Sequence, residues 1–563
     1  MMMLLFLACT PTSVTLSDRA IDDTDTAIED PWGDTVYEPF RLLEVSIELE
    51  PDEWDELRHQ KTNILELLAG DDCLAEPFEK PYTWFDGTVT IDGEAYDRVG
   101  VRKKGLLGSV EPGRPSLKLR LDRNIEDQAF EEVTRFTLNN GRQDQSRFKT
   151  CMGYEILARA GVAAPRCSLA HVVVNGEDLG LYSNVEPIKP PLLARSFGDE
   201  GDGDVFEGTL SDFREDWVGS FENKTNGDTA PLDQLTEAFE TLDDEDFVVR
   251  VEELVDLDQF LEVWAMEVIL GHWDGYNGNT NNFWLYVGED GRLRFIPWGI
   301  DAILVGDQPF GPGQPTSVVA ASALSSRLYA IPETRERYLQ TLDRLLDEVW
   351  KEARLREHLD ELVQVGAPYA WPAGKPAEYF QVLDAMDSFL ATRQDTIQSE
   401  LANGQPVVST DLRANPCLVE HGTVTLAFDT TWGSYGTLPT FSTGDGSLSL
   451  TLDDVDYPTT FMTAIIGEYE PDQSVLFIVG TLEDGNNAAF YGLGPTSSFE
   501  SPGTTLVDWN DWTAYLLRDN QGDLTNWQTM AWISGELQLE ESSLTQGDQV
   551  LGTGELTIWG GRR

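Results

Sequence analysis

The sequence reads His272-Trp273-Asp274-Gly275-Tyr276-Asn277-Gly278-Asn279 near the middle of the chain, and this stretch decides the fold that we predict. Two apolar runs follow it, Asn282 to Val287 and Leu293 to Trp298, separated by the turn Glu289-Asp290-Gly291. Short β-type runs on either side of a turn predict a hairpin. The hairpin leads into Asp301, which places a carboxylate just beyond the end of an apolar strand.

The order and spacing of three polar side chains predict phosphoryl-transfer chemistry. His-x-Asp followed by Asn after four residues is the catalytic-loop pattern of protein kinases. In such a site one carboxylate orients the attacking hydroxyl group, while an amide oxygen and a second carboxylate hold the magnesium ion. Asp274, Asn279 and Asp301 are of these types, in this order. Asp and Asn are also common in turns, so the spacing alone leaves an ordinary turn open, and the hairpin before Asp301 favours a site.

At these residues the chain resembles the CotH kinase family, which comprises atypical protein kinases named after a spore coat protein. The family carries an Asp-x-x-x-Gly-Asn-x-x-Asn-aromatic element, and Asp274 to Phe283 matches it in full. The family's Pro-Trp-Asp-x-Asp element reads Pro297-Trp298-Gly299-Ile300-Asp301 here, so glycine replaces its first acid. If the second acid holds the metal ion, the site is intact. If both acids are needed, this copy is weakened or inactive.

A basic segment stands out in an otherwise acidic chain. It contains Arg102, Lys103, Lys104, Arg114, Lys118 and Arg120. Strand alternation over Leu117 to Leu121 puts Lys118 and Arg120 on the face opposite the leucines. The family has a similar Gly-x-Arg and Lys-Pro-x-x-Lys strand, and this resemblance implies that Lys118, with Arg102 second, binds the nucleotide phosphates. The alternative is a solvated edge strand, in which lysine limits aggregation.

A second hairpin, from Ala170 to Val185, is predicted from the turn signal Asn175-Gly176. It ends in Gly180-x-Tyr182-x-x-x-Glu186, which resembles another element of the family. Kinases orient the phosphate-binding lysine with a glutamate, so the resemblance makes Glu186 the candidate partner of Lys118. The alternative for Glu186 is an ordinary surface position.

Composition limits the partners and the compartment. The chain has 563 residues, of which 41% are hydrophobic, enough for two or three domains with cores of their own. Lys+Arg 39 against Asp+Glu 99 gives a net charge of -60. This charge repels phosphate backbones, so we do not expect nucleic acid as a partner. Cysteines other than Cys9 form an even set that suits one or two disulfides in an oxidising compartment, and their pairing stays open. They are Cys73, Cys151, Cys167 and Cys417.

The N-terminal region predicts export with a lipid anchor. Residues 1–9 form an apolar stretch that ends at Leu7-Ala8-Cys9, which we interpret as a lipoprotein signal peptide with Cys9 as the lipid-bearing residue. Residues 10–39 are rich in Asp, Thr, Ser and Pro, a composition that predicts a disordered acidic tether. We therefore expect localisation at a bacterial cell envelope or surface, with membrane attachment only through the lipid.

Two folded parts are expected after the tether. Residues 40–403 mix strands and helices and form the predicted kinase-like domain, whereas 404–563 alternate with period two and predict a β-sandwich. Aromatic residues of the second part are candidates for carbohydrate binding, although aromatics in a sandwich usually belong to its core. These candidates are Trp509, Trp512 and Trp527.

The predicted fold class is thus α+β, with an atypical protein-kinase-like domain followed by an all-β domain. The resemblance implies an exported kinase that transfers the γ-phosphoryl group of ATP to a protein hydroxyl, with Mg²⁺ or Mn²⁺ as the metal ion. Asp274 would orient the nucleophile, Asn279 and Asp301 would hold the metal, and Lys118 with Arg102 would neutralise phosphate. The alternative is a catalytically inactive scaffold or adhesin, which Gly299 favours.

Overall fold

The computed structural model describes residues 32–106, 111–198, 201–306, 315–371, 374, 378–408, 411–435, 444–452, 455–520 and 523–561. The predicted signal peptide 1–9, with Cys9, lies outside them, as does the predicted tether as far as residue 31. In the part of the chain described, no helix combines the length and apolar character needed to cross a membrane.

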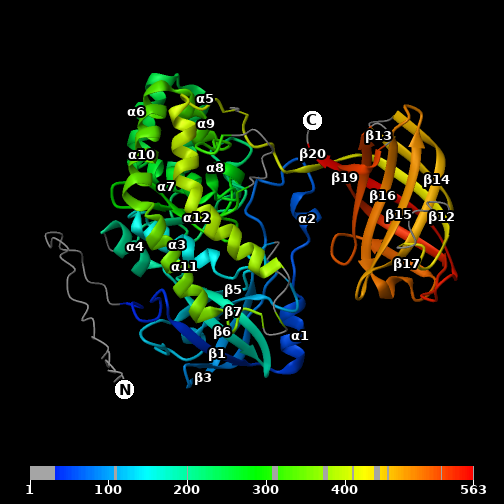
Figure 1. Ribbon diagram of the computed structural model, residues 1–563, viewed down its shortest axis with the longest axis horizontal. Helices are drawn as coiled ribbons and strands as arrows, with labels where there is room; N and C mark the ends of the chain where they lie inside the picture. Colours follow the sequence, from blue (N-terminus) through cyan, green and yellow to red (C-terminus); the bar gives the residue numbers. More distant parts are fainter. Residues whose placement is uncertain are drawn as a thin grey trace, which may run out of the picture.

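The first folded unit is a closed barrel of seven strands in the order β1-β2-β3-β4-β5-β7-β6. Its strands are β1 (Leu42–Glu48), β2 (Phe85–Ile91), β3 (Glu94–Lys104), β4 (Ser116–Arg120), β5 (Arg135–Asn139), β6 (Cys167–Val174) and β7 (Glu177–Val185). The β1–β6 pair is parallel and the other pairs are antiparallel. Helix α1 (Pro51–His59) joins the barrel core through Trp54 and Leu57. Figure 1 shows this barrel below the helices.

Two hairpins of the barrel, β2–β3 and β6–β7, form across tight turns, and the second turn is the predicted Asn175-Gly176. Asp92 and Gly93 have φ of +49° and +86°, and Asn175 and Gly176 have φ of +50° and +80°. Two successive residues with positive φ match the right-handed twist of the flanking strands, and Gly and Asn adopt this conformation readily. The outward face of β3 and β4 carries Arg102 and Lys118, which are partly buried, while their apolar neighbours enter the core.

A helical unit lies on the barrel. It contains residues 272–279, here called the catalytic-loop stretch because of their predicted role. Its main helices are α3 (Lys149–Arg159), α4 (Pro190–Phe197), α5 (Ala230–Thr241), α6 (Asp244–Leu254), α7 (Leu257–Leu270), α9 (Ala323–Ala330), α10 (Pro332–Val349), α11 (Glu352–Gly366) and α12 (Glu378–Ala402). A four-stranded sheet β11-β10-β8-β9 packs among them. Its strands are β8 (Asp204–Gly208), β9 (Glu222–Asn223), β10 (Phe283–Val287) and β11 (Leu293–Pro297).

Helix α7 is the buried centre of the helical unit. Nearly all of its side chains from Phe260 onward are buried, including Trp264, which stacks on Tyr338 of α10 with ring centroids 3.9 Å apart. A helix that is apolar on most of its circumference is stable only when other elements surround it. The helix therefore fixes the start of the catalytic-loop stretch, which follows it directly.

The folded body begins earlier than the predicted boundary at residue 40. Val36 and Tyr37 are buried at 0% and 2% exposure, and Arg166 binds the carboxylate of Asp34 at 2.6 Å and the carbonyl oxygen of Trp32 at 2.7 Å. Residues 32–39 thus pack against the barrel instead of belonging to the tether. The prediction was wrong here because an acidic composition hides a few well-spaced apolar residues.

The C-terminal unit is a second closed barrel and differs from the predicted sandwich. Its strands are β12 (Leu418–Thr431), β13 (Asp445–Leu452), β14 (Val455–Glu470), β15 (Gln473–Leu482), β16 (Asn487–Pro495), β17 (Gly503–Val507), β18 (Thr513–Asn520), β19 (Asp523–Glu541) and β20 (Gln549–Gly561). The order β19-β18-β16-β15-β14-β13-β12-β20 is closed by pairing of β19 with β20. Alternating strands suit both architectures, and only this long-range pairing distinguishes them.

The tryptophans considered for carbohydrate binding have structural positions. Trp512 is 1% exposed and belongs to the core of the C-terminal barrel. Trp509 is 8% exposed and stacks on Trp532 at 4.2 Å between ring centroids. The side chain of Trp527 lies outside the part described. Neither described candidate is available as an exposed platform for a sugar ring.

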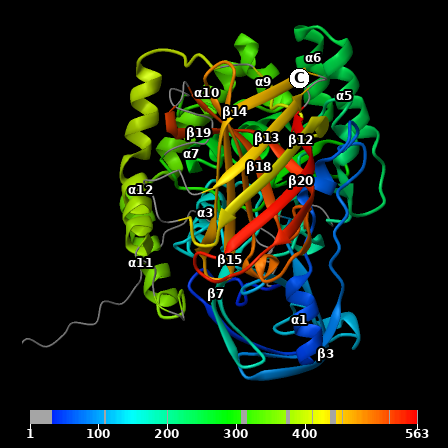
Figure 2. The same cartoon turned by 90° about the vertical axis from the view of Figure 1, so that its right-hand side faces the viewer.

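The two parts of the molecule meet at a compact junction. A disulfide joins Cys73 to Cys417, which are 344 residues apart in sequence. Next to it lies an apolar cluster that includes Trp217 of the helical unit and Trp509 of the C-terminal barrel. The second disulfide, Cys151–Cys167, ties α3 to β6. Figure 2 shows the C-terminal barrel in front of the helical unit, with α1 and β3 below.

Candidate active site

A buried carboxylate of α7, that of Glu267, fixes the conformation of the catalytic-loop stretch through hydrogen bonds. Gly271 ends the helix with a φ of +68°. Glu267 Oε1 accepts a hydrogen bond from the backbone nitrogen of Tyr276, and its Oε2 accepts from the backbone nitrogen and Nδ2 of Asn277. Burial raises the pKa of Glu267 to about 7, although these donors oppose the shift. The loop conformation thus depends on a side chain one helical turn before the loop.

Asp274 sits in a cage of asparagine side chains. Its Oδ1 accepts from Asn279 Nδ2 at 2.6 Å and from Asn281 Nδ2 at 3.2 Å, and its Oδ2 accepts from Asn282 Nδ2 at 2.8 Å. Asp274 is 8% exposed, and burial raises its pKa while the amide donors oppose that shift. The structure therefore brings Asp274 and Asn279 into direct contact.

Asp301 is a second buried carboxylate in this region, and the charge of Asp274 acts on it. Burial raises the pKa of Asp301 to about 7, the negative charges of Asp144 and Asp274 add to the shift, and Lys104 opposes it. Asp144 begins the turn before α3, where its carboxylate accepts from the backbone nitrogens of Ser146 and Lys149. Two negative charges that act on a buried carboxylate favour its neutral form unless a cation is bound nearby.

Gly299, which replaces the family's first acid, has a backbone that disfavours a side chain. Its φ is +56°, and a β-carbon added there would lie 2.5 Å from Oδ1 of Asn282. Since Asn282 is one of the donors to Asp274, an acid at position 299 would disturb the cage. The backbone conformation and the position of Asn282 therefore favour glycine at position 299.

The predicted phosphate residues lie on the outer face of the first barrel. Arg102 and Lys118 are directly opposite each other on β3 and β4. Burial lowers the pKa of Lys118 to about 7, and it lowers the pKa of Arg102, whose guanidinium lies 4.7 Å from the ring centroid of Trp84. Lys104, two residues further along β3, donates to Oδ1 of Asn139. Because the charge of Asp301 acts on Lys104, this basic face adjoins the acidic site.

Arg102, Lys104 and Lys118 form a basic group, and the charge of Glu207 of β8 acts on all three. Its charge is the first opposing influence on the lowered pKa of Lys118. Its carboxylate also binds Lys80 at 3.0 Å and Lys224 at 2.6 Å, and both lysines bind Glu222 as well. These cations hold the pKa of Glu207 well below its usual range against the effect of burial. Lys80, Lys224 and the predicted phosphate residue Lys118 therefore gather around an internal counter-ion.

The structure does not bring Glu186 to Lys118. Glu186 is fully buried, and its carboxylate forms ion pairs with Arg195 at 2.7 Å and Arg166 at 2.9 Å. Burial alone would raise its pKa, but the two arginines lower it. The predicted pairing was wrong because strand β7 ends beside α4 and the N-terminal segment, away from the face that carries Lys118.

The donor set fits a divalent cation in part. Mg²⁺ prefers oxygen ligands, and the buried carboxylate of Asp301, surrounded by like charges, suits such an ion. Asn279 does not suit it in this arrangement, because its Oδ1 already accepts a hydrogen bond from Nε of Arg413 at 2.6 Å. Among the residues described, no group of three or more His, Cys, Asp or Glu side chains is placed to hold a metal ion by itself.

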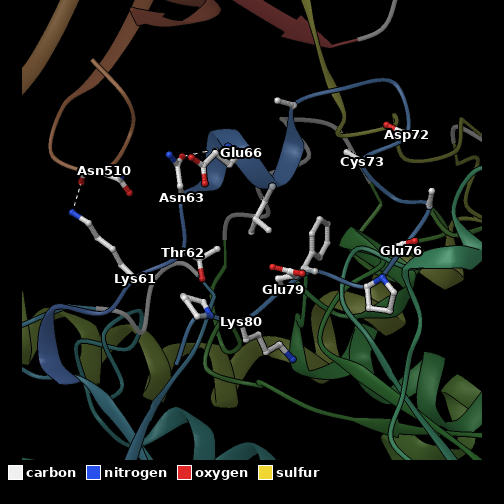
Figure 3. Close-up of a pocket in the computed structure, with 16 residues that line it drawn as sticks. Lys61, Thr62, Asn63, Glu66, Asp72, Cys73, Glu76, Glu79, Lys80 and Asn510 are labelled. Atoms are coloured by element: carbon white, nitrogen blue, oxygen red, sulfur yellow. Dashed lines mark hydrogen bonds between the residues drawn. The ribbon is translucent and has the colours of Figure 1, made fainter. Parts of the chain in front are cut away.

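A cavity of about 720 Å³ lies beside the basic group (Figure 3). It is lined by the segment from Lys61 to Pro81 and by Asn510 of the C-terminal barrel, whose carbonyl oxygen accepts from Lys61 Nζ at 2.5 Å. Figure 3 shows Lys80 and Glu79 projecting from the same stretch of this segment. Lys80 is shared with the Glu207 group. The cavity therefore adjoins the basic face, although Asp274 and Asp301 do not line it.

Several residues of the site were not predicted from the sequence. Asn282 belongs to the family element that was quoted, and Glu207 lies in a short apolar strand, so both carried a weak signal. Asp144 and Lys224 carried none, because they reach the site only through the packing of distant segments. Arg413 was also missed, because it lies in the segment 404–563 that was assigned to the β-sandwich, although the first strand of that unit begins only at Leu418.

The comparison with sequence families identifies one match. The family described as CotH kinase protein matches residues 101–396, which is more than half of the chain and includes every predicted site residue except Cys9. The curated relatives are less than 25% identical to this chain over the matched residues. The inner spore coat protein H of Bacillus subtilis (strain 168) is 24% identical over 241 residues, which cover 40% of this chain and 66% of that protein.

The further similarities include a second curated relative and a solved structure. Spore coat protein homolog 1 of Rhizopus delemar is 23% identical over 181 residues, covering 30% of each chain. The chain thus spans less than two thirds of the length of either curated relative. A crystal structure of the Helicobacter pylori proinflammatory kinase CtkA aligns with 52% of this chain and 93% of its own, at 9% identity and a TM-score of 0.28, which is too low to support an argument.

Proposed function

Since this chain belongs to the CotH kinase family, we propose that it transfers the γ-phosphoryl group of ATP to a hydroxyl group of an acceptor protein. Asp274 orients the acceptor hydroxyl, and Asp301 holds a divalent cation, Mg²⁺ or Mn²⁺. Lys118 and Arg102, together with Lys104, neutralise the phosphates. When bound, the metal ion supplies further neutralisation of the phosphate charge.

The observation that carries the proposal is the meeting of opposite charges from two separate units. Asp301 and Asp274 come from the helical unit, whereas Lys104 and Lys118 come from the barrel, and the charges of Asp301 and Lys104 act on each other. In a chain with a net charge of -60, such a basic group is not explained by the average composition. Phosphoryl transfer depends mainly on positioning and on charge stabilisation, and this arrangement can supply both.

The cellular setting is also proposed. The paired cysteines support an oxidising compartment, and curated relatives are named as spore coat proteins. We propose that the protein is exported and acts at a cell surface or coat, anchored through lipid on Cys9. Growth with labelled palmitate tests the anchor, since Cys9→Ala should carry no label.

The alternative is a non-catalytic scaffold that retains the fold. Gly299 lacks the family's first acid, and Arg413 occupies the oxygen of Asn279. Both observations weaken the metal site as it stands. A scaffold needs no nucleotide, so nucleotide binding separates the two functions.

The first test is thermal unfolding of the full chain with and without Mg-ATP. A ligand that binds only the folded protein at 100 times its Kd stabilises it by about 2.7 kcal/mol. We expect a shift in the parent and none in Asp301→Ala, with Asp290→Ala as control because Asp290 pairs with Arg292 and Arg294 on an exposed turn. Absence of a shift in the parent at millimolar Mg-ATP would favour the scaffold.

A further inference from the structure

Residues 411–417, here called the linker strap, come from outside the helical unit and contact the catalytic-loop stretch. The strap leads into β12, and its Arg413 donates from Nε to Oδ1 of Asn279 at 2.6 Å. Nη1 of Arg413 is buried and has no hydrogen-bond partner among the described residues. The guanidinium is thus packed against the loop, and no open space beside this nitrogen is left for a phosphate group.

The main chain of the strap is fixed at the same residue. The backbone nitrogen of Arg413 donates to the carbonyl oxygen of Ala321 at 2.8 Å, and the backbone nitrogen of Ala321 donates to the carbonyl oxygen of Asn277 at 2.8 Å. The carbonyl oxygen of Arg413 accepts from Nη1 of Arg214 at 3.0 Å. Both backbone groups of Arg413 are therefore used, and one route of contacts leads directly to the catalytic loop.

The far end of the strap is anchored covalently. Cys417 forms the disulfide with Cys73, and Nδ2 of Asn415 donates to the carboxylate of Asp216 at 2.8 Å. A covalent anchor four residues from Arg413 restricts how far the guanidinium can withdraw. It thereby reduces the conformational entropy lost when the strap closes.

The outer side of the strap is not packed. Leu412 is 41% exposed and lines a cavity of about 780 Å³ together with Arg214 and Asp216. Little apolar area is buried at Leu412 itself, whereas the guanidinium of Arg413 lies 5.4 Å from the ring centroid of Trp217. Polar contacts and the disulfide hold the strap in place, and such contacts can exchange for others when a stronger ligand arrives.

We propose that the linker strap is an autoinhibitory element in which Arg413 withholds the amide oxygen of Asn279 from the metal ion. A guanidinium and a divalent cation repel each other and compete for the same oxygen, so the closed strap and the metal–nucleotide complex exclude one another. This inference rests on the proposed function, because it concerns the regulation of the same site. It also accounts for why the amide oxygen is occupied here.

Binding of Mg²⁺ with adenylyl imidodiphosphate to the full chain, measured by calorimetry, tests the strap. Arg413→Met keeps the apolar stem but removes the competing cation. Because a hydrogen bond to a charged group contributes enough to change an equilibrium by a factor of ten or more, we expect affinity to rise at least about tenfold. Leu412→Ala, the neighbouring exposed position, should bind like the parent. Cys73→Ser should bind between the parent and Arg413→Met.

A second measurement needs no variant. Coupling between two binding events is reciprocal, so saturation of the parent with Mg²⁺ and the same nucleotide should accelerate hydrogen exchange at the amide of Arg413. That amide is protected in the closed strap by the carbonyl oxygen of Ala321. A purely structural strap would keep its protection when nucleotide binds.

The outcomes separate the strap from the proposed function. Equal affinity of the parent and Arg413→Met, with binding lost in Asp301→Ala, would overturn autoinhibition and leave the nucleotide site standing. Absence of binding in Arg413→Met as well as in the parent would overturn both. Tighter binding by Arg413→Met together with faster exchange in the saturated parent supports the strap.

Discussion

Individual side chains of the site take their properties from neighbours that are remote in sequence. Lys118 faces Glu207 together with Lys104 and Arg102, and burial in this group lowers its pKa to about 7. A lysine whose pKa is lowered in this way releases its proton more readily than an exposed lysine. It must gain a proton to bind phosphate as a cation, so proton uptake should accompany nucleotide binding.

Proton uptake gives the first prediction. At pH 8, ATP binding should take up at least about one proton, and Lys118→Met should lower the uptake by nearly that amount. Calorimetry in buffers of different ionisation enthalpy measures it. Lys103→Met is the matched control, because Lys103 points into the barrel and donates to the carbonyl oxygen of Arg58. Uptake that is unchanged in Lys118→Met would remove this lysine from the site.

Gly299 gives a second prediction at the same scale. Restoring the family acid with Gly299→Asp should not strengthen Mg-ATP binding, because the new side chain displaces Asn282 from Asp274. We expect Gly299→Asp and Gly299→Ala each to reduce the free energy of unfolding by about 1 to 3 kcal/mol, since a left-handed backbone is strained for other residues. Urea unfolding measures this change. Stronger nucleotide binding by Gly299→Asp would mean that the missing acid had limited the site.

At the scale of elements, helix packing places ionisable groups where water is excluded. Helix α11 puts His358 against Phe40, with ring centroids 4.7 Å apart, and His358 is 5% exposed. Burial lowers its pKa from 6.5 to about 4, and the nearby charge of Arg159 adds to the shift. The folded protein thus holds this histidine neutral, and protonation favours the unfolded chain.

The pH dependence of stability follows from this shift. The pKa of His358 is lower in the folded protein than in the unfolded chain. The neutral histidine therefore contributes its full share to the free energy of unfolding above pH 6.5, and this share is lost as pH falls toward 4. At pH 4.5 the parent should have lost about 2 to 3 kcal/mol on this account, whereas His358→Phe should escape that loss. Urea unfolding at pH 7 and pH 4.5 gives the comparison. Identical losses in both proteins would contradict a buried neutral histidine.

On the scale of the whole molecule, separate cores are joined by a small junction. The core of the C-terminal barrel contains Trp512 and shares no residue with the cores of the first barrel and the helical unit. The Cys73–Cys417 disulfide and the cluster around Trp217 and Trp509 connect the parts. Each core can therefore be destabilised without direct damage to the others.

Scanning calorimetry should show this independence. Trp512→Ala should reduce the stability of the C-terminal barrel by about 3 to 5 kcal/mol, the usual effect of truncating a buried tryptophan. A second transition, from the helical unit and first barrel, should keep its temperature and its response to Mg-ATP. A single transition that shifts as a whole would show that the cores unfold as one unit.

The turn of the β6–β7 hairpin, the apolar run of α7 and the spacing of Asp274 and Asn279 are features of the sequence itself. Turn residues such as Asn175-Gly176, the apolar run of α7, and the spacing of Asp274 and Asn279 act over short distances along the chain. The α+β class and the family follow from such local signals. They could be predicted because propensity, alternation and turn chemistry depend mainly on neighbouring residues.

Tertiary structure alone decided the closure of the C-terminal barrel, the partner of Lys118 and the position of Arg413. The pairing of β19 with β20, the contact of Glu207 with the basic face and the hydrogen bond from Arg413 to Asn279 all join segments that are distant in sequence. No local pattern encodes such contacts. They form because whole elements must bury their apolar faces together, and that packing determines which charged side chains meet.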